Sequence, residues 1–313
     1  MVHALRAVVT ALCVLTLVGC VGTTSVKVNP DVAGRIQSTR AYIVIPQDEM
    51  NAGVARSGVG DSLGLLGALI DVSIEAKRAS KASLAIEPVR KGLADFDFRA
   101  EFEKKFRAAQ SDLSRLKINQ IEVTNEPYSM EIHNRLRAGM SQDSLLTMAV
   151  DYQLSADFRC LVVYGTVTLL QRGRDEEQYL GNFRYISAPV SSKSGDTAIK
   201  AWSDTNARLL RAALHEGINE TIRMLKLDFV PKTDKDRNKV APLGADGKLK
   251  VITIKLPRGI YKGGVTTNKL SNMASEILSK EGDRIIFRSQ KTDLYTFEDH
   301  VHSSTTRERF VIQ

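Results

Sequence analysis

This 313-residue sequence lacks the features that most directly identify an enzyme or a membrane-spanning protein. Only three cysteines and one tryptophan occur. After residue 19, no stretch reaches the roughly 18 apolar residues that a spanning helix needs. There is no phosphate loop and no G-x-G-x-x-G pattern of dinucleotide binding. We therefore expect no spanning helix in the body of the protein and no cofactor.

Cys20 follows a segment typical of an export signal. Arg6 gives a positive start, and residues 7–18 form an uncharged, mostly apolar run that is too short to span a bilayer. The sequence Leu17-Val18-Gly19-Cys20 resembles the lipobox of bacterial lipoproteins. The resemblance implies cleavage before Cys20 and several acyl chains on that residue, each buried methylene contributing about 0.8 kcal/mol. The alternative is an ordinary secretory signal with a cysteine near the cleavage point.

Val21 indicates the membrane to which such a lipoprotein is sorted. The sorting rules of the lipoprotein family place an aspartate at this position in proteins that stay in the inner membrane. Valine there implies the outer membrane, with the body of the protein in the periplasm. Residues 21–39 are small and polar, without a convincing period. We expect residues 1–19 to be a signal peptide and residues 20–39 a flexible, lipid-anchored tether.

The remaining cysteine, Cys160, has no expected disulfide partner. Cys13 would leave with the leader, and Cys20 would carry lipid. Cys160 lies in the strand-like apolar run 158–164. This context predicts a buried, inert thiol rather than a nucleophile.

The charge balance suggests an anionic partner. The formal net charge is +8, and residues 231–313 carry 16 Lys and Arg against 10 Asp and Glu. Lipid A phosphates, other anionic lipids or an acidic protein surface would complement this excess. The export signal argues against nucleic acid. The alternative is a solvated basic surface without a specific partner.

Apolar periodicity predicts an α+β fold, an α/β sandwich in which helices cover one mixed sheet. Strands are expected to be parallel where helices connect them and antiparallel in hairpins.

We expect a domain at 40–230, a linker at 231–248 and a small β-rich C-terminal module at 249–313. Its clearest strands are 250–256 and 282–289, with a helical piece at 270–278. In the main domain, the predicted strands are 41–45, 118–124, 158–170 and 179–187, and the predicted helices are 61–82, 98–116 and 201–227, while 145–150 suits either type.

The predicted helix 61–82 has an almost bare face. Gly60, Gly64 and Ala68 recur every four residues, with Gly67 beside them. Such a face allows close helix packing or contact with a membrane. We favour packing over a lipid-inserting element.

Three groups of residues have side chains suited to catalysis or metal binding. Glu298, His300 and His302 alternate, so a strand would place them on one face as weak candidates for zinc or copper ligands. The carboxylates Asp95, Asp97, Glu101 and Glu103 surround a helix start, where capping explains them better than acid–base catalysis. His133 and His215 are isolated and are expected to be structural or surface groups. We therefore predict no catalytic residues and no functional metal site.

The pattern of the main domain resembles a domain of envelope lipoproteins. The run YIVIP, a glycine-rich helix, an amphipathic helix and the strand LVVYGTVTLL are similar in layout to the N-terminal domain of the translocation protein TolB and to curli-secretion-type lipoproteins. The hairpin DYQLSADFRCLVVYGTVTLL and the helix beginning AWSDTNARLL also resemble uncharacterised bacterial lipoproteins. The likeness covers residues 40–228 and carries no catalytic residues. No pair of membrane-crossing hairpins is evident, which argues against a pore.

These observations favour a non-enzymatic, lipid-anchored outer-membrane lipoprotein that faces the periplasm. Its partners would be membrane lipid, through the acylated Cys20, and a protein of an envelope complex for which it acts as scaffold or assembly partner. One alternative is an envelope hydrolase with an unrecognised site. Another is a binder of anionic lipid or lipopolysaccharide that works through the basic C-terminal module.

Overall fold

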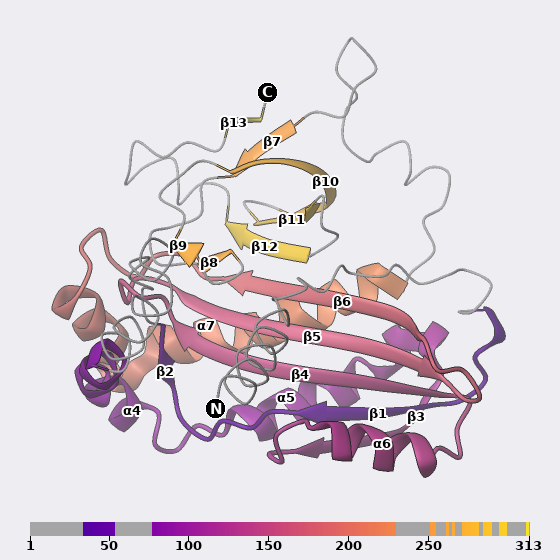
Figure 1. Ribbon diagram of the computed structural model, residues 1–313. Helices are drawn as coiled ribbons and strands as arrows, with labels where there is room; N and C mark the ends of the chain where they lie inside the picture. Colours follow the sequence, from indigo (N-terminus) through magenta and orange to yellow (C-terminus); the bar gives the residue numbers. More distant parts are fainter. Residues whose placement is uncertain are drawn as a thin grey trace, which may run out of the picture.

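A computed structural model describes residues 34–53 and 77–229, together with the strands of the C-terminal region (Figure 1). The fold is α+β, as the sequence predicts: a mixed sheet carries helices on its two faces. The order of the sheet is β13-β7-β10-β11-β12-β6-β5-β4-β1-β3, with the short β2 (Asn51–Ala52) pairing with β4. Among the described residues, no helix combines the length and apolar content needed to cross a membrane.

Strand β1 (Thr39–Val44) is central to the first part of the fold. It pairs in parallel with β3 (Ile118–Thr124) on one side and with β4 (Ser144–Leu154) on the other. Ala41 and Ile43 face one apolar core, whereas Tyr42 and Val44 face another. The strand is therefore buried on both faces, which explains its uninterrupted apolar sequence.

Strands β4, β5 (Leu161–Gln171) and β6 (Glu177–Ile186) form the antiparallel meander that the sequence predicts. The segment 145–150, which suited either type, belongs to β4. Its apolar residues are buried on both faces of the sheet, with Leu146, Met148 and Val150 in one core and Leu145 in the other, and β1 and β5 pair with its two edges. Pairing on both sides thus resolves the ambiguity of a short apolar run.

One face of the sheet carries α4 (Glu87–Gly92), α5 (Phe98–Ala108), the 3-10 helix η1 (Gln110–Leu116) and α7 (Asp196–Phe229) (Figure 1). The predicted helix 98–116 is thus confirmed, with a change of helix type at Ala109. The predicted apolar stripe of α7 is buried in this core: Leu210, Leu214, Ile218, Ile222 and Leu225.

Helix α7 begins five residues earlier than predicted and is interrupted near its start. Thr205, Asn206 and Ala207 have φ of 53°, 55° and 53°. The left-handed conformation costs about 1–2 kcal/mol per residue for side chains other than glycine. Arg211 offsets part of this cost because its guanidinium donates to the carbonyl oxygens of Asn206 and Gly92, at 3.0 Å and 2.6 Å.

The opposite face carries α6 (Met130–Ala138), which the sequence analysis did not predict. Ser129 caps it by accepting a hydrogen bond from the backbone N–H of Ile132. Ile132 and Leu136 pack against Tyr42 and Val44 of β1 in a second, smaller core. The connection from β3 to β4 therefore passes over β1 on this face.

In the C-terminal region, the sheet continues through β12 (Leu294–Glu298), which pairs in parallel with β6. The strands expected at 250–256 and 282–289 are present as β7 (Val251–Ile254) and β11 (Arg284–Ser289). The helix predicted at 270–278 is wrong. That segment is β10 (Ser271–Glu281), which forms antiparallel ladders with β7 and β11 on its two edges. The remaining strands are β8 (Tyr261–Lys262), β9 (Val265–Thr266) and β13 (Val311–Ile312).

Several predicted segments lie outside the described residues: the signal peptide, most of the tether, residues 61–76 of the first helix and the linker at 231–248. Residues 77–85 are helical, in keeping with the end of the predicted helix. The domain boundaries remain predictions.

Candidate functional site

The carboxylates near the start of α5 have structural contacts. Asp97 caps the helix by accepting a hydrogen bond from the backbone N–H of Ala100 at 2.9 Å. Asp95 forms an ion pair with Arg211. The hydrogen bond from the Arg211 guanidinium is the main reason that the pKa of the Asp95 carboxyl lies below its ordinary value. Glu103 pairs with Arg107 at 2.6 Å. The helix cap predicted at Asp97 is thus confirmed.

The isolated histidines also have local partners. His133 Nδ1 lies 2.9 Å from the Tyr128 hydroxyl. His215 Nδ1 lies 3.7 Å from Glu101, and its ring meets the ring of Phe96 edge-on at 5.3 Å. Both contacts agree with the structural role expected for these residues.

Cys160 is completely buried, as predicted. Burial raises the pKa of its thiol, so the nucleophilic thiolate is disfavoured. Its backbone N–H donates to Ser155 Oγ at 3.0 Å in the turn between β4 and β5. The residue is therefore part of the core beside this turn.

The candidate metal ligands are only partly placed. Glu298 is the last residue of β12, opposite Arg284 in the register with β11. His300 and His302 lie outside the described residues, as does Cys20. Within the described ranges, no group of three or more His, Cys, Asp and Glu side chains could hold a metal ion.

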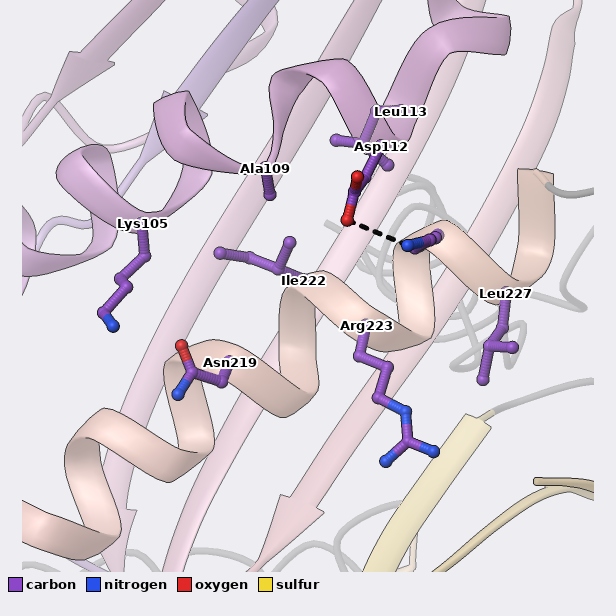
Figure 2. A pocket seen from close by; sticks show the side chains of 9 residues that line it. Lys105, Ala109, Asp112, Leu113, Asn219, Ile222, Arg223 and Leu227 are labelled. Carbon is purple, nitrogen blue, oxygen red and sulfur yellow. Dashed lines mark hydrogen bonds and ion pairs between the residues drawn. The ribbon is translucent and has the colours of Figure 1, made fainter. Parts of the chain in front are cut away.

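A surface groove of about 430 Å³ lies between the α5–η1 segment and α7 (Figure 2). We name it the α5–α7 groove. It exists because α5 ends at Ala108, and the chain continues as a 3-10 helix with a kink at Leu113. The small side chain of Ala109 faces this space opposite Ile222. The nine lining residues are Lys105, Ala109, Asp112, Leu113, Asn219, Ile222, Arg223, Lys226 and Leu227.

The groove combines an apolar floor with a mainly cationic rim. Leu113 and Ile222 are 2% and 7% exposed. Lys226 Nζ crosses between the two elements to Asp112 Oδ2 at 2.8 Å, the dashed contact in Figure 2. Arg223 forms an ion pair with Glu220 at 3.3 Å. Three cations and one carboxylate therefore line a surface that also offers apolar contacts.

The groove was not predicted from the sequence, which carries only a partial signal for it. Asn219, Arg223 and Lys226 follow one another at spacings of four and three, which places them on one face of α7 beside the buried stripe. The position of Lys105 relative to that face depends on how α5 packs against α7. Helical periodicity alone does not predict this packing.

A second cavity of about 430 Å³ lies beside α4. Arg90 organises its rim by donating to the carbonyl oxygens of Met50 and Ser83, at 3.0 Å and 3.1 Å. Tyr152 lies in the lining and stacks on Phe98 with ring centroids 4.1 Å apart. Burial is the main reason that the pKa of Tyr152 rises to about 12. The lining of this cavity thus combines a neutral phenol and apolar side chains with charged side chains at the rim.

Comparisons with known proteins give no family assignment. No family model and no curated protein matches the chain. Among solved structures, the chain is similar to the hypothetical protein CT253 from Chlamydia trachomatis, with 7% sequence identity and a TM-score of 0.23. That match covers 59% of this chain and 96% of the other. It is too weak to support an argument about fold or function, and the resemblance to envelope lipoproteins remains a prediction.

Proposed function

We propose that the protein is a lipid-anchored lipoprotein of the outer membrane that faces the periplasm and acts as a non-enzymatic scaffold or assembly partner of an envelope complex. The observation that carries the proposal is the segment Leu17-Val18-Gly19-Cys20 at the end of a short apolar run. An acylated Cys20 would join the protein to the membrane through its own lipid.

The distance between the anchor and the folded body fits this role. Strand β1 begins at Thr39, 19 residues after Cys20. A chain of this length reaches at most about 65 Å when fully extended. The α+β body would therefore remain close to the membrane while it contacts proteins in the periplasm.

A scaffolding role also agrees with the contacts of the side chains that acid–base catalysis would use. Asp97 caps a helix, and Asp95 and Glu103 pair with arginines. Cys160 has a buried thiol with a raised pKa. These groups stabilise the fold in the structure.

The substitution Val21→Asp tests the proposed location. An aspartate after the acylated cysteine is the inner-membrane retention signal of the lipoprotein family. We expect the wild-type chain in the outer-membrane fraction and Val21→Asp in the inner-membrane fraction, with Val21→Asn as an uncharged control that stays with the outer membrane. A variant that remains entirely in the outer membrane would contradict the sorting step.

Affinity purification tests the proposed partner. The wild-type protein would be cross-linked in cells and purified from detergent-solubilised membranes, with Val21→Asp as the mislocalised control. We expect an envelope protein to be recovered with the wild type and depleted with the control. Recovery of the same proteins with both chains, or of none, would count against the scaffold role.

A further inference from the structure

We propose that the α5–α7 groove binds an amphipathic anion, a single apolar chain that bears a carboxylate or phosphate head group. This site is separate from the anchor at Cys20 and from the C-terminal module. It does not depend on the proposed lipoprotein function. Its volume of about 430 Å³ lies within the range of about 300–1,000 Å³ typical of small-molecule sites.

The apolar part of the ligand would lie along the floor of the groove. Ala109, Leu113, Ile222 and Leu227 supply this floor, and the first of them leaves open the space that a longer side chain would fill. An apolar chain placed there would remove both its own surface and that of the floor from water. Removal of this apolar surface from water favours binding.

The head group would be bound at Lys105. The neighbouring carboxylates of α5 already have other partners: Glu101 lies 3.7 Å from both Lys104 Nζ and His215 Nδ1, and Glu103 pairs with Arg107. In the part of the chain that the structure describes, no carboxylate lies at ion-pair distance from Lys105. The ammonium group can therefore pair with an external anion without breaking an internal ion pair.

The other polar side chains of the rim favour an anion over a cation. The amide of Asn219 lies across the groove from Lys105 (Figure 2). Lys226 is held over the groove by Asp112, which is 56% exposed and can turn towards solvent when an anion binds. Arg223 adds a further positive charge to the lining. A cationic ligand would meet three positive charges and the single carboxylate of Asp112 in the lining.

Binding can be measured by displacement of the fluorescent probe 11-(dansylamino)undecanoate from a chain of residues 20–313 that carries Cys20→Ser. Removal of the leader leaves every described element intact, because the first of them begins after residue 33. The competitors are dodecanoate, dodecyl phosphate, dodecanol and inorganic phosphate. We expect the first two to displace the probe at least tenfold more strongly than the last two. Equal displacement by dodecanol, or none by dodecanoate, would overturn the proposal.

Two matched substitutions locate the head group. Lys105→Met removes the charge and keeps a long apolar stem, and we expect the Kd for dodecanoate to rise about fivefold. Lys104→Met makes the same change at the neighbouring position, which is 74% exposed and outside the groove, so the Kd should change less than about twofold. Equal effects of the two substitutions would show that the anion binds elsewhere.

A third substitution tests the floor. Ala109→Leu fills the groove with three additional carbon atoms, and we expect dodecanoate binding to fall at least tenfold while the far-UV circular dichroism stays unchanged. If this variant does not fold, Leu227→Ser, at the partly buried end of the groove, replaces it and should weaken binding about fivefold. Undiminished binding in a folded floor variant would overturn the assignment of the apolar chain to this groove.

Discussion

The indole Nε1 of Trp202 donates a hydrogen bond to the carbonyl oxygen of Phe158 over 2.7 Å. The contact joins the start of α7 to the turn between β4 and β5. Phe158 has a φ of 62°, in the left-handed region that is costly for a bulky side chain. The indole thus fixes a strained turn against the helix that covers the sheet.

Trp202→Phe should destabilise the protein. The substitution removes the donor and leaves the Phe158 carbonyl without it, and an unsatisfied buried group costs about 1–3 kcal/mol. We expect the free energy of unfolding in urea to fall by about 2 kcal/mol. A change below about 0.5 kcal/mol would show that the hydrogen bond does not stabilise the turn.

Gly217 lies at a close approach between α7 and the sheet. A Cβ atom there would lie 2.7 Å from Val163 Cγ2 and 3.0 Å from the Tyr185 ring. For Gly217→Ala, overpacking at contacts this short costs about 3 kcal/mol, and the higher helix propensity of alanine regains about 1 kcal/mol. We therefore expect urea denaturation to show a loss of about 2 kcal/mol.

Gly34→Ala is the matched control because, among the described residues, no atom beyond its neighbours in the chain lies within 4 Å of the added carbon. Its free energy of unfolding should stay within about 0.5 kcal/mol of the wild type. A Gly217→Ala protein as stable as this control would contradict the close packing.

The sequence predicts the parts of the fold that local interactions determine better than the parts that depend on contacts between distant residues. A continuous apolar run predicted β1, because that strand is buried on both faces, and helical periodicity predicted α7, because one buried face creates that pattern. Periodicity missed α6, whose two buried side chains, Ile132 and Leu136, make only a short pattern. It misassigned β10, because the sequence SNMASEILSKE has no clean two-residue alternation of apolar and polar side chains.

Other features depend on distant contacts. The left-handed residues 205–207 contain no glycine, and Arg211 stabilises them through α4. Likewise, the α5–α7 groove requires Lys105 and Arg223, more than 100 positions apart in sequence, to face the same space. Neither arrangement has a local sequence signature. The structural roles of Asp97 and Cys160 were predictable because capping and burial are local properties.

Tyr152 makes the stability of the folded protein fall at alkaline pH. Its pKa rises from 10.0 to about 12 on folding, mainly through desolvation. The unfolded chain therefore releases the phenolic proton first. The contribution of this group is complete below pH 10 and is lost as the pH rises towards 12, by up to about 1.4 kcal/mol per pH unit.

Tyr152→Phe isolates this contribution. Between pH 9 and 11, urea denaturation should show a smaller loss of stability with pH for the variant than for the wild type. Other tyrosines and lysines titrate in both proteins, so the difference between the two slopes reports Tyr152. Parallel slopes would contradict the raised pKa.

Strand β3 lies at an edge of the sheet, where two side chains cover its outer carbonyl groups. Arg107 donates to the Ile121 oxygen at 3.1 Å, and Gln110 donates to the Ile118 oxygen at 2.6 Å. Exposed edges promote pairing between molecules. We expect the double substitution Arg107→Ala and Gln110→Ala to increase self-association in light scattering, relative to Lys104→Ala. A monomeric double variant would show that these contacts do not protect the edge.

Labelling with palmitate tests the anchoring of Cys20 most directly. Cells that produce the wild type, Cys20→Ser or Cys13→Ser would be grown with labelled palmitate, and their membranes would be fractionated. The proposal predicts labelled protein in the outer-membrane fraction for the wild type and for Cys13→Ser, which changes only the leader. It predicts no label for Cys20→Ser, which should remain an uncut precursor or become soluble. Palmitate incorporation and outer-membrane fractionation of Cys20→Ser would contradict the proposal.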